Sequence, residues 1–140
     1  MTESAQFIAA NDHFAAHCGI ETIEAAPGHA RVRLVISPEH FNAAGTVHGG
    51  AIFTLADYAF ALAANSGGTL ALAVDTHLTF IKAVTGGVLE AEATEIACNR
   101  RLGTYQVRIR QDDTTVALFQ GTAYRKQGAR PMDGFQGKKE

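Results

Sequence analysis

The sequence predicts an α+β domain in which one antiparallel sheet wraps round a single long helix. Residues 48–66 form a long apolar segment that contains no proline and ends at Gly67-Gly68, where a helix would stop. Nearly the whole circumference of this helix is apolar, so it should be buried on every side. Four strand-like runs follow it without another helix, and a curled sheet is the element that can cover such a helix.

The segments before the central helix predict a covering helix and a hairpin. Residues 4–17 carry an apolar stripe at helical spacing and predict a short N-terminal helix. Two runs with period-two alternation, residues 20–26 and 30–36, flank Pro27-Gly28, which supplies the turn. In the second run the apolar residues face one way and the two arginines the other. The hairpin should therefore have one buried face and one solvated face.

The rest of the chain predicts a meander and a tail. The expected strands are residues 70–81, 88–98, 104–111 and 115–125. Alternating inward and outward residues are typical of an antiparallel sheet with one buried face. We therefore expect one domain over residues 1–125 and a flexible tail over residues 126–140, where glycine, proline and charged residues occur without a period. The outer strands are open edges at which a second copy can dock.

Composition excludes several classes of protein. Of the 140 residues 46% are hydrophobic, and the net charge is −2 with neutral histidines. Because no basic cluster is present, we expect no nucleic-acid partner and no anionic-membrane partner. No apolar segment is long enough to cross a bilayer, and the N-terminus lacks a basic signal-peptide start, so we expect a cytoplasmic protein. Cys18 and Cys98 lie eighty residues apart, a spacing typical of reduced thiols and not of a metal site.

Two adjacent glycines open the central helix. Gly49 and Gly50 each cost the helix about 1 kcal/mol relative to alanine, and a tight turn explains one of them better than two. A helix N-terminus without side chains leaves unpaired N–H groups that a carbonyl oxygen can approach at the positive end of the helix dipole. The pair therefore predicts an oxyanion site.

Asp57 lies on this apolar helix without an evident partner. A buried carboxylate costs several kcal/mol unless it is paired or protonated, which favours a functional role over a structural one. Asp57 is eight positions beyond Gly49, about 12 Å along the helix axis, so the two cannot reach one acyl group. The two halves of the site should then come from two copies whose helices pack antiparallel across a two-fold axis.

The segment resembles a known family of enzymes at specific positions. Asn42, His48-Gly49-Gly50 and Asp57 follow the pattern Asn-x5-His-Gly-Gly-x6-Asp before an alanine-rich helix and a meander. The chain resembles the hotdog-fold acyl-CoA thioesterases of the phenylacetate-pathway (PaaI-like) type, over residues 26–125. The resemblance implies that Asp57 acts as nucleophile or general base, that the Gly49 N–H binds the carbonyl oxygen and that Asn42 positions water or the thioester. It implies that His48 braces the loop.

The same resemblance suggests further contacts with the substrate. Some branches of the family use a Ser or Thr on the first long strand to hold water, and Thr76 is the corresponding candidate. Phe60, with its alanine neighbours, suggests an apolar acyl pocket near Asp57. Arg100 and Arg101 form a turn that can bind the phosphates of coenzyme A. Family members commonly carry a proline soon after the first long strand, and this chain has no proline at that place.

These observations predict a hydrolase that releases CoA from a small aryl-acyl or medium-chain acyl-CoA, without metal or other cofactor. CoA enters only as part of the substrate. The active unit should be a homodimer with shared sites, and the resemblance implies a homotetramer. An (R)-specific hydratase or dehydratase, with His48 and Asp57 as the catalytic pair, and a non-catalytic acyl-CoA-binding module are the alternatives.

Overall fold

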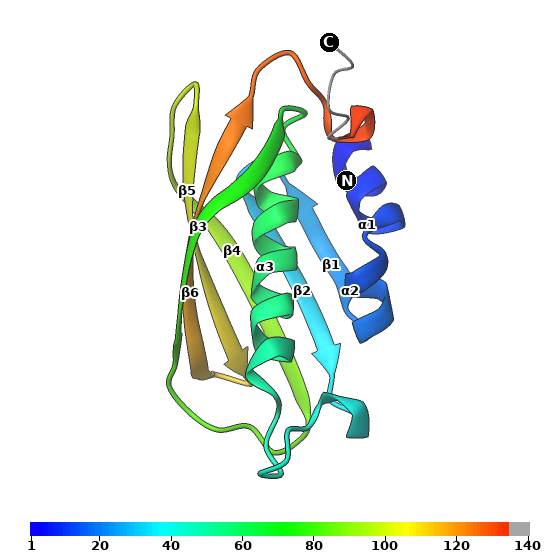
Figure 1. Ribbon diagram of the computed structural model, residues 1–140, viewed down its shortest axis with the longest axis vertical. Helices are drawn as coiled ribbons and strands as arrows, with labels where there is room; N and C mark the ends of the chain where they lie inside the picture. The colour runs from blue at the N-terminus through cyan, green and yellow to red at the C-terminus, as the bar shows by residue number, and fades with distance from the viewer. Residues whose placement is uncertain (135–140) are drawn as a thin grey trace.

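A computed structural model describes residues 1–134 and shows one six-stranded sheet curled round one long helix (Figure 1). The strands are β1 (Glu21–Ala26), β2 (His29–Val35), β3 (Leu70–Phe80), β4 (Val88–Cys98), β5 (Leu102–Gln111) and β6 (Thr114–Lys126). All pairs are antiparallel, in the spatial order β1-β2-β4-β5-β6-β3. Helix α3 (Gly49–Asn65) packs across the concave face, which confirms the predicted hotdog fold.

The core lies between this helix and the inward residues of the sheet. Alternate residues of each central strand are buried, as the period-two pattern predicts. The fully buried members include Val32, Leu34, Leu89, Val107, Ile109 and Phe119 from the sheet, and Leu55 and Leu62 from α3. The core therefore fixes the axial and rotational position of α3, on which the predicted site residues lie.

One side of α3 is less buried than the sequence analysis predicts. Apart from Phe53, which is 37% exposed, the helix beyond Ala51 is otherwise buried, but Gly50 is exposed and Thr54, Asp57, Ala61 and Ala64 are only half-buried. These five residues lie three or four positions apart and therefore form one stripe along the helix, which we call the α3 stripe. The expectation that α3 is covered on every side is wrong for the single chain, because the sheet curls round only part of its circumference.

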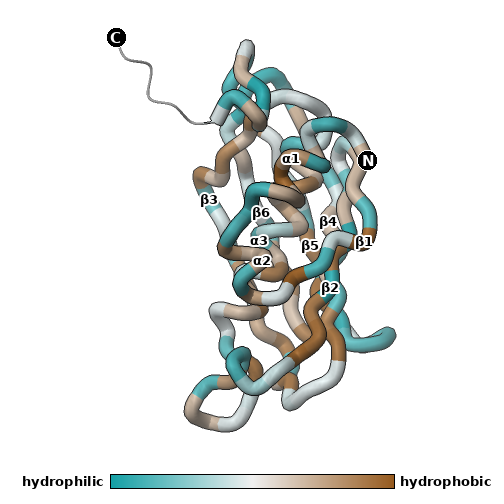
Figure 2. The backbone as a smooth tube through the Cα atoms, turned by 90° about the vertical axis from the view of Figure 1, so that its right-hand side faces the viewer, coloured by the Kyte–Doolittle hydropathy of each residue, from teal (hydrophilic) through white to brown (hydrophobic). Residues whose placement is uncertain are grey.

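The N-terminal segment forms two helices instead of one. Helix α1 (Glu3–Asn11) and helix α2 (His13–Cys18) are separated by Asp12, whose φ of −80° and ψ of 88° are not helical. The Asp12 carboxylate accepts the Ala15 N–H at 3.0 Å. Aspartate favours this capping geometry over a helix interior, which explains the break within the predicted helix 4–17. Figure 2 shows both helices on the near side of α3.

The composition predicts a flexible tail from residue 126, and the structure describes residues 126–134 in contact with the rest of the domain. Strand β6 continues to Lys126, and the Leu70 N–H donates to the Ala129 carbonyl at 2.9 Å, so the chain stays attached beyond the sheet. A short 3-10 helix, η2 (Pro131–Asp133), then packs on α1 and buries Pro131. The rest of the predicted tail, residues 135–140, lies outside the described residues.

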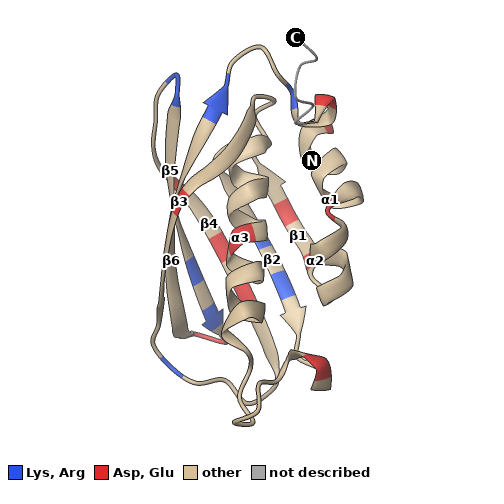
Figure 3. Ribbon diagram, in the orientation of Figure 1, with Lys and Arg blue, Asp and Glu red and all other residues tan. Residues whose placement is uncertain are grey.

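The outer face of β1, β2 and β4 carries charges of both signs (Figure 3). Arg31 binds Glu24 at 2.9 Å and Glu90 at 3.1 Å, and His29 binds Glu92 at 2.7 Å. Cross-strand pairing of opposite charges explains how this face stays in solvent while the opposite face forms the core. None of the helices within residues 1–134 has the length and hydrophobicity that a membrane span needs.

Candidate active site

The first turn of α3 leaves one backbone donor without an acceptor. His48 is the N-cap, and its Nδ1 accepts the Gly50 N–H at 2.8 Å. The His48 carbonyl accepts the N–H groups of Ala51 and Ile52 at 2.9 and 3.3 Å. Within residues 1–134, the Gly49 N–H is the one donor of this turn that has no acceptor. It is therefore available to a ligand oxygen at the positive end of the helix dipole.

The two glycines thus have different roles. The sequence predicts that Gly50, like Gly49, contacts the substrate, but in this structure the Gly50 N–H donates to the His48 ring, so a contact of Gly50 with substrate stays a prediction. A Cβ on Gly50 would lie 3.0 Å from His48 Nδ1, which explains why the capping geometry favours glycine there. The resemblance implies that His48 braces the loop, and its ring caps the first turn of α3 through this hydrogen bond. Because Nδ1 accepts a hydrogen bond, the proton of the neutral ring lies on Nε2.

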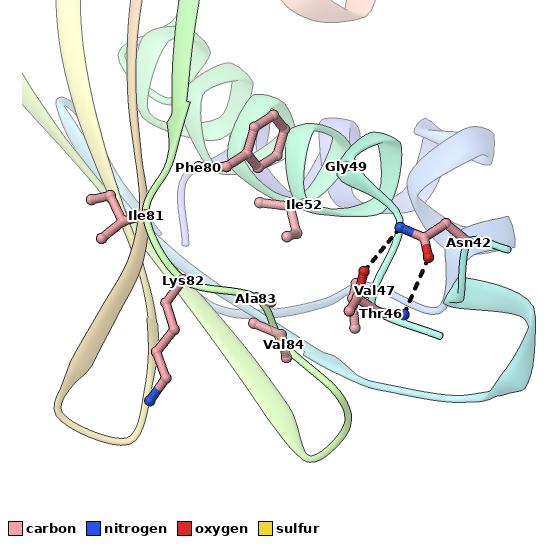
Figure 4. Close-up of a pocket in the computed structure, with 10 residues that line it drawn as sticks. All are labelled: Asn42, Thr46, Val47, Gly49, Ile52, Phe80, Ile81, Lys82, Ala83 and Val84. Carbon is pink, nitrogen blue, oxygen red and sulfur yellow. Dashed lines mark hydrogen bonds between the residues drawn. The ribbon is translucent and has the colours of Figure 1, made fainter. Parts of the chain in front are cut away.

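Asn42 organises the loop that leads into α3. Its Oδ1 accepts the N–H groups of Ala44 and Thr46 at 3.0 and 3.1 Å, and its Nδ2 donates to the Thr46 hydroxyl at 2.9 Å (Figure 4). Both lone-pair directions of Oδ1 are therefore used within the loop. The second Nδ2 proton has no acceptor among the described residues, and Asn42 lines the neighbouring cavity, so one amide donor is left for water or thioester.

A cavity of about 330 Å³ opens beside Gly49. Its walls are mainly apolar and come from the loop before α3, from α3 itself and from the segment after β3: Asn42, Thr46, Val47, Gly49, Ile52, Phe80, Ile81, Lys82, Ala83 and Val84. Figure 4 shows Phe80 and Ile52 at the Gly49 end of α3, whereas the Lys82 side chain points away. The Val47 N–H donates to the Val84 carbonyl at 2.8 Å and joins the two loops. The free N–H therefore borders an apolar cavity with one polar side.

Asp57 does not line this cavity. Its carboxylate is half-buried on the α3 stripe and has no hydrogen-bond or ion-pair partner within residues 1–134. Desolvation by burial, followed by the nearby negative charge of Asp12, raises the pKa of Asp57. The eight-residue offset along α3 separates Asp57 from Gly49 by about 12 Å. One chain therefore carries the two halves of the predicted site without bringing them together.

Two of the remaining predicted residues differ in accessibility. Phe60 is only 2% exposed and packs on Phe119 and Tyr105 with ring centroids 5.6 and 5.5 Å apart. Phe60 is therefore a core residue in the single chain, and its contact with substrate stays a prediction. Thr76 lies opposite Gly121, on the helix-facing side of β3, and is half-buried. It remains a candidate.

The turn with Arg100 and Arg101 lies at the far end of the molecule from Gly49. The Arg101 carbonyl accepts the Arg125 N–H at 2.7 Å. Arg125 in turn lines a small cavity with Gly67, beyond the C-terminal end of α3. The helix has 17 residues and is about 25 Å long, so the structure does not bring these arginines to the Gly49 end of their own chain.

His40 is a bracing residue that the sequence analysis missed. It is 6% exposed, its Nδ1 accepts the Ser37 N–H at 3.0 Å, and its Nε2 donates to the Cys18 carbonyl at 2.7 Å. Its own carbonyl accepts the His48 N–H at 2.7 Å. His40 therefore connects α2 to the residue that caps α3. The available signal was a serine three positions before a histidine, a weak capping pattern.

Comparison with known proteins identifies the family. Residues 44–118, which include Gly49 and Asp57, match the sequence model of the thioesterase superfamily. The chain belongs to the thioesterase superfamily. It is 36% identical over 117 residues to "Acyl-coenzyme A thioesterase PaaI" of Escherichia coli K12, covering 82% of this chain and 84% of that protein. This match confirms the resemblance to the PaaI-like enzymes.

A second relative and a solved structure are also similar to this chain. A relative from Archaeoglobus fulgidus, named "Putative esterase", is 45% identical over 105 residues, covering 74% of this chain and 68% of the relative. The solved structure of the E. coli PaaI protein from the phenylacetic acid degradation operon superposes with a TM-score of 0.87 at 34% identity, over 91% of this chain and 94% of that one. Fold and sequence thus agree that this member of the superfamily is a thioester hydrolase.

Proposed function

We propose that the protein hydrolyses a small aryl-acyl or medium-chain acyl-CoA to the free acid and CoA. The observation that carries this proposal is the unpaired Gly49 N–H at the start of α3, beside an apolar cavity. A thioester carbonyl oxygen bound there gains stabilisation as negative charge develops on it. The apolar walls suit an acyl group, and the relative named acyl-coenzyme A thioesterase supports the CoA ester as substrate.

Hydrolysis needs a nucleophile and a base that activates it. In the simplest mechanism water is the nucleophile and Asp57 is the base. Asp57 takes a proton from water as the water oxygen bonds to the thioester carbon, and the C–S bond then breaks with its electron pair on sulfur. The thiolate accepts a proton to give free CoA. Direct attack by the Asp57 carboxylate, followed by hydrolysis of the anhydride, gives the same products. Neither route requires a metal or another cofactor.

Two copies of the chain make up the active unit in this proposal. The α3 stripe is uncovered, has small residues on both sides of Asp57, and allows a second helix to approach closely. Antiparallel packing of two such stripes brings Asp57 of one protomer to the partner's Gly49. Inactive Gly49→Pro and Asp57→Ala chains should regain activity when mixed, because one intact site forms in each mixed dimer. A monomer with full turnover contradicts the proposal.

The same arrangement supports CoA binding by Arg100 and Arg101. Gly67 is ten residues beyond Asp57, about 15 Å along the axis, and the arginine turn lies near that end of α3. The pantetheine arm of CoA matches roughly four extended residues, about 14 Å. Replacing either arginine by alanine should raise KM more than it lowers kcat, and the effect should shrink with a pantetheine thioester. An equal loss on both substrates points to a misfolded turn.

The hydratase alternative has weaker support. It needs a catalytic histidine paired with an acid from the partner, Asp57, but His48 Nδ1 already accepts the Gly50 N–H, which leaves only Nε2 for that chemistry. We also propose a cytoplasmic protein, since both cysteines are free.

A homotetramer is supported by the exposed apolar row of Leu72, Tyr124 and Leu102 across the outer sheet face.

A panel of acyl-CoA esters tests the proposal, with free thiol measured by a chromogenic disulfide. We expect thiol release from at least one aryl-acyl or medium-chain ester, and its loss in Asp57→Asn. An enoyl or β-hydroxyacyl ester that changes without releasing thiol favours the hydratase. Tight binding of acyl-CoA without any turnover favours the binding module.

A further inference from the structure

Phe80 has no role in the core, although it is one of the larger apolar side chains of the fold. It is 56% exposed, and no other aromatic ring among the described residues stacks on it. It is the last residue of the edge strand β3, and its ring lines the cavity beside Gly49 (Figure 4). A half-exposed ring at the wall of an apolar cavity is positioned to contact a ligand.

The ring lies directly against Gly49. A Cβ built on Gly49 would lie 2.9 Å from Cζ of Phe80 and 3.3 Å from Cε1, closer than two carbon atoms pack. The tip of the ring therefore occupies the space that a side chain at position 49 would fill. Any oxygen bound to the Gly49 N–H is a neighbour of this ring, and so is the carbon that carries the oxygen.

The backbone that carries Phe80 is held in place. Phe80 pairs with Ala117 of β6, and the N–H groups of Ile81 and Lys82 both donate to the Val116 carbonyl, at 2.8 and 3.1 Å. These hydrogen bonds hold the end of β3 in place, so only rotation of the Phe80 ring can make room for a larger acyl group. The cavity wall also includes Ile52, which is 4% exposed and packs in the core.

We infer that Phe80 determines acyl-group specificity by restricting branching at the carbon next to the thioester carbonyl. This inference rests on the proposed function. A CH₂ group or the planar carbon of an aryl ring at that position passes between the Phe80 ring and the loop before α3, whereas a tetrahedral carbon with two carbon substituents meets the Phe80 ring. The substrate class is therefore acyl-CoA without a branch at this position, whether the rest of the acyl group is aromatic or aliphatic.

Isomeric substrates test this inference, because they differ in shape and not in hydrophobicity. Butyryl-CoA and isobutyryl-CoA form one pair; 3-phenylpropanoyl-CoA and 2-phenylpropanoyl-CoA, which are also isomers, serve if aryl esters are the faster class. The wild type should prefer the unbranched ester, and Phe80→Ala should reduce the ratio of kcat/KM values about tenfold. Phe80→Leu should give an intermediate ratio. Val74→Ala is the matched control, since Val74 is exposed on the same strand and does not line the cavity.

A second measurement does not depend on turnover. Gly49→Ala should lower the melting temperature in the wild-type background, where the new methyl meets the ring, and should lower it less when Phe80 is also alanine. If Gly49→Ala lowers the melting temperature equally with Phe80 and with alanine at position 80, the contact between position 49 and Phe80 is overturned. An active wild type whose ratio is unchanged by Phe80→Ala overturns this inference alone. A wild type that releases thiol from no acyl-CoA overturns the proposed function, and the inference with it.

Discussion

Asp57 gives the sharpest test, because its substitution should change activity and stability in opposite directions. Asp57→Asn keeps the size of the side chain but cannot accept a proton, and general-base catalysis typically supplies a factor of about 10² to 10⁴. We expect kcat to fall by about that factor in a free-thiol assay. Asp75→Asn, on the exposed outer face of β3, is the control and should retain activity.

The effect on stability follows from the environment of the carboxylate. Asp57 has no partner within residues 1–134, so its removal leaves no opposite charge unpaired. Alanine is a better helix former than aspartate by about 0.5–0.7 kcal/mol, so Asp57→Ala should be at least as stable as the wild type. That gain corresponds to roughly 2 °C in Tm for a domain of this size.

The pH dependence has a defined sign. Burial raises the pKa of Asp57 in the folded state above its unfolded value, so ionised Asp57 destabilises the fold at neutral pH. This penalty disappears as pH falls through the folded pKa towards the unfolded pKa. The stability advantage of Asp57→Asn should therefore be largest at neutral pH and shrink in acid. Destabilisation by about 3–5 kcal/mol would indicate a paired buried charge and refute this reasoning, as would a variant that still turns over.

Three further predictions concern the supports of the site. His48→Ala removes the acceptor of the Gly50 N–H and should destabilise the protein by about 1 kcal/mol in urea unfolding, with a smaller loss of kcat than Asp57→Asn. His40→Ala leaves two backbone groups without partners and should destabilise by about 2–4 kcal/mol in the same assay. The hydrogen bond from His29 lowers the pKa of Glu92, so Glu92→Gln should be less stable than the wild type at neutral pH, and this difference should vanish as pH falls through the folded pKa.

The period of the apolar residues was sufficient to predict the helix and every strand, because burial on one face imposes that period. It was not sufficient to distinguish a core residue from a pocket residue on α3. Phe60 and Asp57 lie three positions apart, yet one is in the core and the other on the α3 stripe. Only the curvature of the sheet decides which part of the helix circumference is covered, and that curvature depends on all six strands.

The site shows the same division between local and long-range information. The glycine pair and the preceding histidine predicted a helix start with free donors, which is a local property. The sequence could not show which donor remains free, because this depends on the rotamer of the His48 ring. The contact of Phe80 with Gly49 joins positions 31 residues apart, and the register of β3 on β6 creates it.

The polarising group of the proposed site belongs to the main chain, and this affects how its role can be detected. Gly49→Ala keeps the N–H and instead introduces a methyl group against Phe80, so a scan of alanine variants reports the crowding and not the hydrogen bond. Replacing the amide that contains this N–H by an ester removes the donor and leaves every side chain in place. The identity of residue 49 does not reveal the donor either, since any residue except proline supplies the N–H; what the contact with Phe80 requires at position 49 is the absence of a side chain.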